Sequence, residues 1–178
     1  MEWKKDPERK LALSLSRGET YSTYVSIGDL KASSGLLYSR GYEFCHALAF
    51  LDKDRNTGVL SHMDIDTWPE HLLDGYAGSF KGGHNVKPIR KIYENPDLIK
   101  VLHVYSKTNN LTKNWRFTEK NIEKVLQERG IVKDSIEHIK LYENGKHTTN
   151  RALLLDTKKG ELCVFPNGEE QYLVIPMN

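Results

Sequence analysis

Cysteine is scarce in this sequence, with Cys45 and Cys163 the only two among 178 residues. Small extracellular domains often depend on a dense disulfide framework, and a single pair of cysteines excludes that class. Long hydrophobic runs are absent too, since no stretch approaches the ~18 apolar residues of a membrane-spanning helix. Residues 1–6 contain no apolar core of the kind found in signal peptides. These absences together predict a cytoplasmic protein with two free thiols and no membrane partner.

An excess of charge of one sign is also lacking, because 26 Lys and Arg side chains oppose 24 Asp and Glu side chains. A net charge of +2 is not the electrostatic footprint of a nucleic-acid-binding domain, so no nucleic-acid partner is expected. Hydrophobic residues make up 38% and charged residues 28% of the chain, a balance typical of globular proteins. The length fits one domain over residues 1–178.

Local patterns predict many strands and few helices. Asp6-Pro7 and Gly18 are typical of the two ends of a helix, which predicts a helical N-terminal extension over residues 1–20. Thr118 precedes the clearest helical pattern in the chain, and Gly130 ends it. On this helix Ile122, Val125 and Leu126 share one face. Strands are expected over residues 21–27, 36–38, 98–105, 136–142, 151–156, 161–165 and 171–175, the last of them at a sheet edge.

Residues 42–51 and 59–65 are predicted to form a β-hairpin, since two apolar stretches flank a polar turn that ends at Gly58. Strands and helices that do not alternate strictly indicate an α+β fold, described equally as a layered α/β fold. We expect two to four helices to pack on a mainly antiparallel sheet or sandwich.

Cys45 and His62 are the best candidates for catalysis, because a thiolate nucleophile needs a nearby base. If Phe50 pairs with Val59, Cys45 and His62 share one face of the hairpin as diagonal neighbours. A register shifted by one residue places them on opposite faces. A free cysteine in an apolar strand is more often a small core residue, and both interpretations stay open.

Ser39 and Thr57 are candidates for a third group that orients the His62 imidazole, as a carboxylate or amide does in other enzymes. The segment between Ser39 and Cys45 contains Gly41. A serine that only forms a turn is the plainer interpretation of Ser39. Cys163 has no obvious histidine partner in the sequence and is interpreted as structural.

A metal site is a further alternative. On a strand, His62, Asp64 and Asp66 point to one side, where His84 or His71 would complete a ligand set. No tighter ligand motif such as His-Glu-x-x-His is present, and acidic residues that leave a strand are more often solvated turn formers. Residues 82–85 (Gly-Gly-His-Asn) match neither a P-loop nor a dinucleotide fingerprint. No metal and no cofactor is therefore expected.

The order Ser39, Cys45, His62 resembles that of the bacterial chemoreceptor glutamine deamidases and, more loosely, of the deamidating toxins that share their core. Those proteins carry a Ser or Thr, then a Cys after a Gly-containing segment, then a His after a hairpin turn, at very similar spacing. Further similarity is carried by segments outside these three residues. These are the opening strand and turn at 25–30, the helix at 118–126, and the strands at 150–156 and 161–165.

The resemblance implies a deamidase-like core over residues 22–166 that hydrolyses a glutamine side chain of a protein substrate to a carboxylate and ammonia. It implies Cys45 as nucleophile, His62 as its base and Ser39 as the group that orients the imidazole. The Gly-Ser that usually precedes the family's cysteine is Glu43-Phe44 here. This departure motivates the alternative, a catalytically silent interaction module that binds partners through residues 76–85 and 107–114. A metal-dependent hydrolase centred on His62 is the third alternative.

Overall fold

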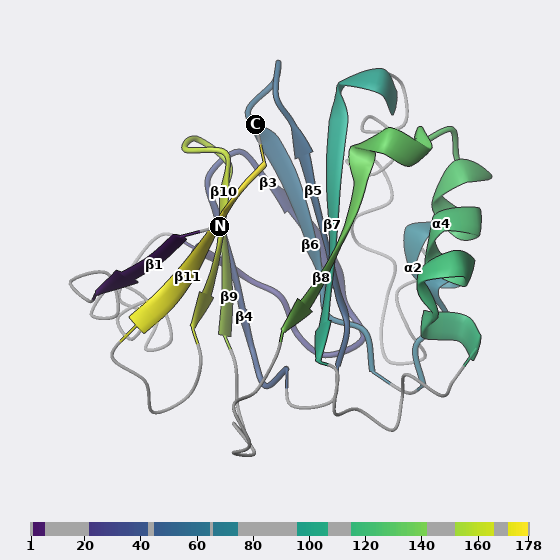
Figure 1. The fold of residues 1–178 in the computed structure, drawn as a ribbon, viewed down its shortest axis with the longest axis horizontal. Helices are drawn as coiled ribbons and strands as arrows, with labels where there is room; N and C mark the ends of the chain where they lie inside the picture. Colours follow the sequence, from purple (N-terminus) through teal and green to yellow (C-terminus); the bar gives the residue numbers. More distant parts are fainter. Residues whose placement is uncertain are drawn as a thin grey trace.

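The structure, a computed structural model, shows two β-sheets packed face to face with helices on the outer side of one (Figure 1). It describes residues 2–5, 22–42, 45–64, 66–74, 96–106, 115–141, 152–165 and 171–177. The expected α+β class is confirmed. Of the sheet and the sandwich that were expected, the structure has the sandwich, with two sheets.

One sheet has six strands and the other has five. In spatial order the six-stranded sheet contains β1 (Glu2–Lys5), β11 (Gln171–Pro176), β10 (Glu161–Phe165), β9 (Ala152–Asp156), β4 (Leu36–Arg40) and β2 (Ser22–Tyr24). The five-stranded sheet contains β3 (Leu30–Ser33), β6 (Thr57–Ser61), β5 (Ala47–Asp52), β7 (Ile99–Ser106) and β8 (Ile136–Leu141). Pairing is antiparallel except between β2 and β4 and between β7 and β8, so the sheets are mainly antiparallel as expected.

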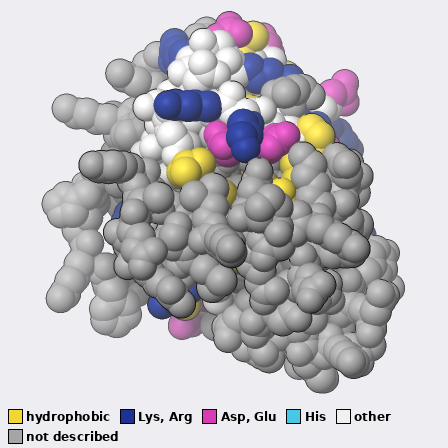
Figure 2. Space-filling view, turned by 90° about the vertical axis from the view of Figure 1, so that its left-hand side faces the viewer, with side chains coloured by type: hydrophobic (Ala, Val, Ile, Leu, Met, Phe, Trp, Pro, Cys, Tyr) yellow, Lys and Arg dark blue, Asp and Glu magenta, His cyan; other side chains and the backbone are white. Residues whose placement is uncertain are grey.

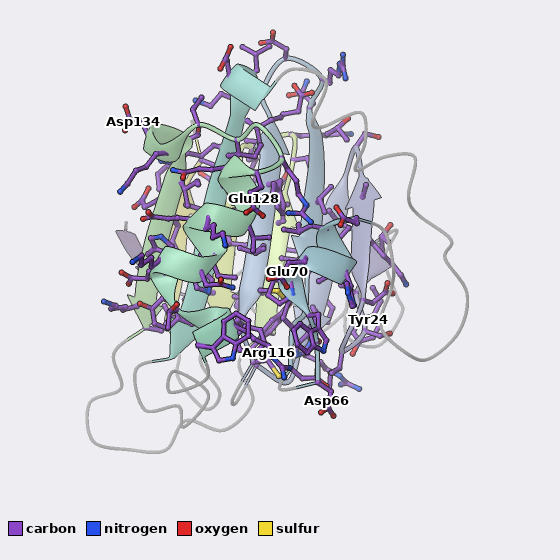
Figure 3. The ribbon with its side chains drawn as sticks, turned by 90° about the vertical axis from the view of Figure 1, so that its right-hand side faces the viewer. Tyr24, Asp66, Glu70, Arg116, Glu128 and Asp134 are labelled. Carbon is purple, nitrogen blue, oxygen red and sulfur yellow. The ribbon has the colours of Figure 1, made fainter. Side chains whose placement is uncertain are left out.

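Five short helices are present in the described ranges. They are α2 (Pro69–Leu73), η1 (Pro96–Leu98), η3 (Trp115–Phe117), α4 (Glu119–Gln127) and η4 (Lys133–Ser135). The predicted helix start is confirmed, since the Thr118 side chain accepts a hydrogen bond from the Asn121 amide. Figure 3 shows α4 and α2 lying across the outer face of the five-stranded sheet, with Arg116 of η3 at the lower end of α4.

The strand β5 illustrates how the layers form, because all six of its side chains are buried. Ala47, Ala49 and Leu51 join the apolar cluster between the sheets. Leu48 and Phe50 point the other way, into the cluster covered by the helices, which includes Ile122 and its neighbours on α4. Two-residue periodicity thus places alternate side chains of one strand in two different cores.

The hairpin has the register that the sequence predicted, with Phe50 paired to Val59 in antiparallel strands. An isolated bridge between His46 and Met63 continues the same register beyond both strands. Cys45 and His62 therefore lie on the same face of the hairpin, the one that faces the six-stranded sheet.

Gly58 at the start of β6 lies very close to the six-stranded sheet. A Cβ atom there would be 2.7 Å from Thr157 Cγ2 and 2.8 Å from Leu155 Cδ2, closer than side chains normally approach. Only glycine fits this position without displacement of the facing side chains. The two sheets are consequently in near contact at this point.

Several expectations at the chain ends differ from the structure. Residues 171–175 were expected at an edge, but β11 is an interior strand because β1 pairs with it. Residues 2–5, expected within a helical extension, form β1, and the helix predicted between Asp6 and Gly18 lies outside the described residues. The strand β3 was not expected, because its four residues between two turns carry little pattern.

Two features bear on the expectation of no membrane partner and no nucleic-acid partner. Within the described ranges, no helix combines the length and the apolar character that crossing a bilayer requires. On the face seen in Figure 2, the described basic and acidic side chains lie next to one another.

Candidate functional site

Ser39 and His62 meet between the two sheets. Ser39 lies on β4 of the six-stranded sheet, and His62 directly follows β6 of the five-stranded sheet. The Ser39 Oγ atom is 2.9 Å from His62 Nδ1, and both side chains are completely buried. Their neighbours Leu37 and Leu60 belong to the apolar layer between the sheets. Two of the three predicted site residues are thus joined by a hydrogen bond that connects the sheets.

The hydrogen bonds of Ser39 define which nitrogen of His62 carries the proton. The Ser39 hydroxyl donates to the carbonyl oxygen of Val25 at 2.6 Å. A hydroxyl has one hydrogen to donate, so Ser39 Oγ must accept from His62 Nδ1–H. The neutral imidazole then presents an unprotonated Nε2, the basic nitrogen. His62 Nε2 is buried and makes no hydrogen bond within the described part of the chain.

Tyr42 holds the imidazole from one side. Its ring stacks on that of His62 with centroids 3.9 Å apart and planes inclined by 17°. The Tyr42 hydroxyl donates to the Ser61 carbonyl oxygen at 2.8 Å. Gly41 adopts a φ of 87°, which favours glycine and lets the chain turn from β4 toward His62. Tyr42 was not among the predicted site residues, although it lies only three positions after Ser39 and follows Gly41.

The backbone of His62 is held outside the β5–β6 ladder. Its amide donates to the Asp29 carbonyl oxygen at 3.0 Å, and its carbonyl accepts from the Gly28 amide at 2.7 Å. On β5, the Leu48 amide donates to Ser61 Oγ at 2.8 Å instead of to a backbone carbonyl. The hairpin therefore opens locally at the candidate site, and the turn at Gly28 fixes the position of the histidine.

Cys45 lies just before β5 and packs against the apolar layer between the sheets. It is half-buried, whereas Cys163 of β10 is buried in the cluster on the outer face of the six-stranded sheet. The register makes Cys45 a diagonal neighbour of His62 on one face of the hairpin. His62 Nε2 makes no hydrogen bond to it in the described part of the structure. Residues 43–44, which distinguish this chain from the deamidase pattern, lie outside the described residues.

Thr57, the other candidate for a third group, lies at the opposite end of the hairpin from His62. Its hydroxyl donates to the Arg55 carbonyl oxygen at 3.3 Å within the turn. Ser39, and not Thr57, therefore contacts the imidazole.

Burial governs the protonation of the site. It lowers the pKa of His62 to about 4, against a smaller opposing effect of the Asp64 carboxylate. It also raises the pKa of Tyr42, whose environment includes Ser39 and Cys45. The imidazole is therefore neutral at pH 7, and Tyr42 keeps its proton.

The acidic residues beyond His62 form a turn. Asp64 Oδ1 accepts from Thr67 Oγ1 at 2.7 Å and from the Asp66 amide at 3.2 Å. Among the described residues, no group of three or more His, Cys, Asp or Glu side chains is arranged to hold a metal ion. His84, proposed as a fourth ligand in the metal alternative, lies outside the described residues.

Ser39→Ala is expected to lower the free energy of unfolding by about 1–3 kcal/mol, because it leaves the buried His62 Nδ1–H without its acceptor. Urea denaturation at pH 7.5 measures the change. Ser34→Ala, at an exposed position nearby, is the matched control and is expected to stay within about 0.5 kcal/mol of the parent chain. Equal stability of the Ser39→Ala and Ser34→Ala variants would contradict the described hydrogen bond.

No protein-family model and no curated protein matches this chain. Neither comparison therefore supports the resemblance to the chemoreceptor deamidases. Among solved structures, the chain is similar to the crystal structure of the Bacillus licheniformis hypothetical protein YfiH, with 14% sequence identity and a TM-score of 0.40. The similarity covers 62% of this chain and 49% of that one, so the chain spans about half of its length.

Proposed function

We propose that this protein is a cysteine-dependent amidohydrolase that deamidates glutamine side chains of a protein substrate. Cys45 is the nucleophile, His62 the base and Ser39 the group that orients the imidazole. The observation that carries the proposal is the hydrogen bond from His62 Nδ1 to Ser39 Oγ. It directs the basic Nε2 away from Ser39, on the face of the hairpin that also carries the half-buried Cys45.

In the first half of the reaction, His62 Nε2 takes the thiol proton as Cys45 Sγ attacks the carboxamide carbon. Backbone N–H groups near Cys45 would stabilise the oxygen anion that forms. The imidazolium then gives its proton to the departing nitrogen. Ammonia leaves, and the acyl group remains on Cys45 as a thioester. In the second half, His62 takes a proton from water, hydroxide adds to the thioester carbon, and the Cys45 thiol is restored as the carboxylate is released.

Neutral His62 defines the mode of catalysis. Because burial lowers its pKa to about 4, the resting imidazole is neutral and is not part of a thiolate–imidazolium pair. His62 then acts as a general base only while the carbon–sulfur bond forms. Ser39 stabilises the transient imidazolium, since its oxygen accepts from Nδ1–H in both protonation states.

One observation favours a second candidate, the catalytically silent interaction module. His62 is completely buried, and its Nε2 is sealed from solvent. Alkylation by iodoacetamide at pH 7.5 separates the candidates, with Cys163 as the internal reference. The amidohydrolase requires Cys45 to react faster than Cys163, whereas equally slow alkylation of both thiols favours the interaction module.

Ammonia release from casein, an unfolded protein rich in glutamine, tests the proposal directly. The parent chain and the Cys163→Ala variant are expected to release ammonia at the same rate. The Cys45→Ala variant is expected to release it only at the rate of casein alone. Mass spectrometry locates the product, since each deamidated glutamine gains about 1 Da from the exchange of an amide for an acid. Ammonia release by Cys45→Ala at the parent rate would exclude Cys45 as the nucleophile.

A further inference from the structure

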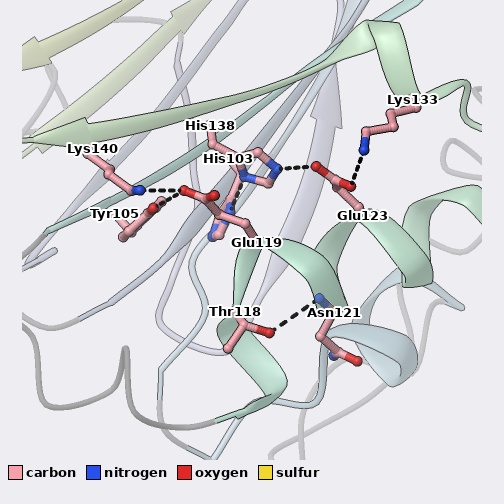
Figure 4. Close-up of polar contacts among 9 residues, drawn as sticks. All are labelled: His103, Tyr105, Thr118, Glu119, Asn121, Glu123, Lys133, His138 and Lys140. Atoms are coloured by element: carbon pink, nitrogen blue, oxygen red, sulfur yellow. Dashed lines mark hydrogen bonds and ion pairs between the residues drawn. The ribbon is translucent and has the colours of Figure 1, made fainter.

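Three histidines and a glutamate form a continuous hydrogen-bonded chain on the helix side of the five-stranded sheet. Figure 4 shows three of these residues, His103, His138 and Glu123. His46 Nδ1 is 2.9 Å from His103 Nε2, and His103 Nδ1 is 2.9 Å from His138 Nδ1. His138 Nε2 is 3.3 Å from Glu123 Oε1. We call these four residues the histidine chain. It runs from before β5, across β7 and β8, to helix α4.

The histidine chain is separate from the candidate active site. His46 follows Cys45 in the sequence, but adjacent residues of an extended segment point to opposite faces. Cys45 packs in the layer between the sheets. The ring of His46 stacks instead on Phe117 of η3, at a centroid distance of 4.8 Å, and on Tyr105 of β7. Phe117 belongs to the apolar layer under the helices.

Counting hydrogens assigns one set of tautomers to the histidine chain. Three neutral imidazoles carry three N–H hydrogens, and the chain has three contacts to fill. Since a carboxylate only accepts, His138 donates from Nε2 to Glu123. His138 Nδ1 then accepts from His103 Nδ1–H, and His103 Nε2 accepts from His46 Nδ1–H. His46 Nε2 remains as a lone pair, buried and without a hydrogen bond in the described part of the chain.

A fourth hydrogen has no place in this arrangement. When a proton is added to any of the three imidazoles, each contact can still hold only one hydrogen, so proton transfer along the contacts moves the surplus to His46 Nε2. There it becomes an N–H donor without an acceptor, which is costly in a buried site. Water can satisfy it, and to admit water Phe117 of η3, which stacks on the His46 ring, must move away.

The charged groups around the histidine chain already have other partners. On α4, Glu119 accepts from Tyr105 Oη and pairs with Lys140 of β8 at 2.9 Å. Glu123 pairs with Lys133 of η4 at 3.2 Å. On η3, the Arg116 guanidinium lies over the ring of Trp68, 3.7 Å from its centroid. Burial and the neighbouring imidazoles lower the pKa of His103, and burial lowers that of His46.

We infer that the histidine chain is an acid-sensitive latch that holds the η3–α4 segment on the five-stranded sheet and releases it when the chain takes up one proton. The latch is closed with three hydrogens in the chain and opens with four. It does not depend on the proposed amidohydrolase activity, because none of its members contacts Ser39 or His62 in the described structure.

The protonation state of the closed latch can be read by nitrogen-15 NMR of the intact chain at pH 7.5. The inference requires neutral rings with the hydrogen on Nδ1 of His46, on Nδ1 of His103 and on Nε2 of His138. An imidazolium at His46 or His103, or the opposite tautomers, overturns it. This measurement uses the unmodified protein, so it does not depend on the folding of any variant.

Opening of the latch is tested by amide hydrogen exchange at pH 7.5 and pH 5, expressed as protection factors. We expect protection of Ile122, Val125 and Leu126 on α4 to fall at least tenfold more than protection of Leu154 and Val164 in the other sheet. The double variant His46→Leu/His103→Leu should lose this selective fall, and the exposed-site control His71→Gln should keep it. A selective fall that persists in the double variant, or an equal change at all five amides, overturns the inference.

Discussion

Replacing His62 with glutamine is expected to lower the rate of ammonia release from casein by about 10²–10⁴-fold, the usual contribution of a positioned general base. Glutamine keeps a polar group beside Ser39 but cannot carry a proton between Cys45, the leaving nitrogen and water. The substitution acts on both halves of the reaction, because His62 is the base in each. The Cys45 thiol remains, so the loss is expected in kcat more than in KM.

The pH profile of the parent chain distinguishes His62 from an ordinary histidine. A base whose pKa lies near 4 stays unprotonated from pH 8 to pH 5.5, so kcat/KM is expected to show no inflection near pH 6.5. Initial rates on a glutamine peptide, with circular dichroism recorded at each pH, measure this directly. The control His71→Gln should retain the parent rate and profile. A half-maximal rate near pH 6.5 would mean that the His62 environment is more polar than described.

Acidification from pH 7.5 to pH 5 is expected to reduce the free energy of unfolding by roughly 4 kcal/mol. Burial lowers the pKa of His46 and of His62 to about 4 in the folded state, while an unfolded histidine titrates at 6.5. Below pH 6.5 the unfolded chain therefore binds more protons than the folded one, and stability falls with pH. Linkage gives about 2 kcal/mol for each of the two histidines at pH 5. His103 adds to the loss, because its pKa is lowered as well.

Urea denaturation at pH 7.5, 6 and 5 measures this loss, provided that the m-value stays constant. Stability is expected to be fully present above pH 6.5 and to decline steadily down to pH 5. His62→Gln should reduce the pH-dependent loss by about 2 kcal/mol, since one of the two shifted groups is gone. The exposed His71 provides the matched control, and His71→Gln should show the parent pH dependence. A free energy of unfolding that is constant from pH 7.5 to pH 5 would contradict the burial of these imidazoles.

The candidate site was predictable from the sequence as far as its contacts are local. A polar turn between two apolar stretches indicated the hairpin, and one assumed pair, Phe50 with Val59, placed Cys45 and His62 on a common face. Ser39 was one of two candidates, with Thr57, for the group that orients the imidazole. The contact between Ser39 and His62 joins strands that belong to different sheets. The residue pattern within one strand does not show which strand of the other sheet it will face.

The histidine chain was not predictable for the same reason. His46, His103 and His138 come together because β5 pairs with β7 and β7 pairs with β8, contacts between segments far apart in the sequence. The strand β7 was expected, but neither its partners nor its register could be derived from its own residues. The same holds for β1, which pairs with β11 from the other end of the chain. Helix α4 was predictable in detail because its cap at Thr118 and its apolar face depend on residues within two turns.

The close approach of the two sheets at Gly58 has a consequence for the candidate site. Near this residue the backbone of β6 is almost in contact with Leu155 and Thr157, so no space is left for a side chain. His62 directly follows the other end of this strand. A larger residue at position 58 is therefore expected to push the two sheets apart and to weaken the hydrogen bond between Ser39 and His62 that joins them.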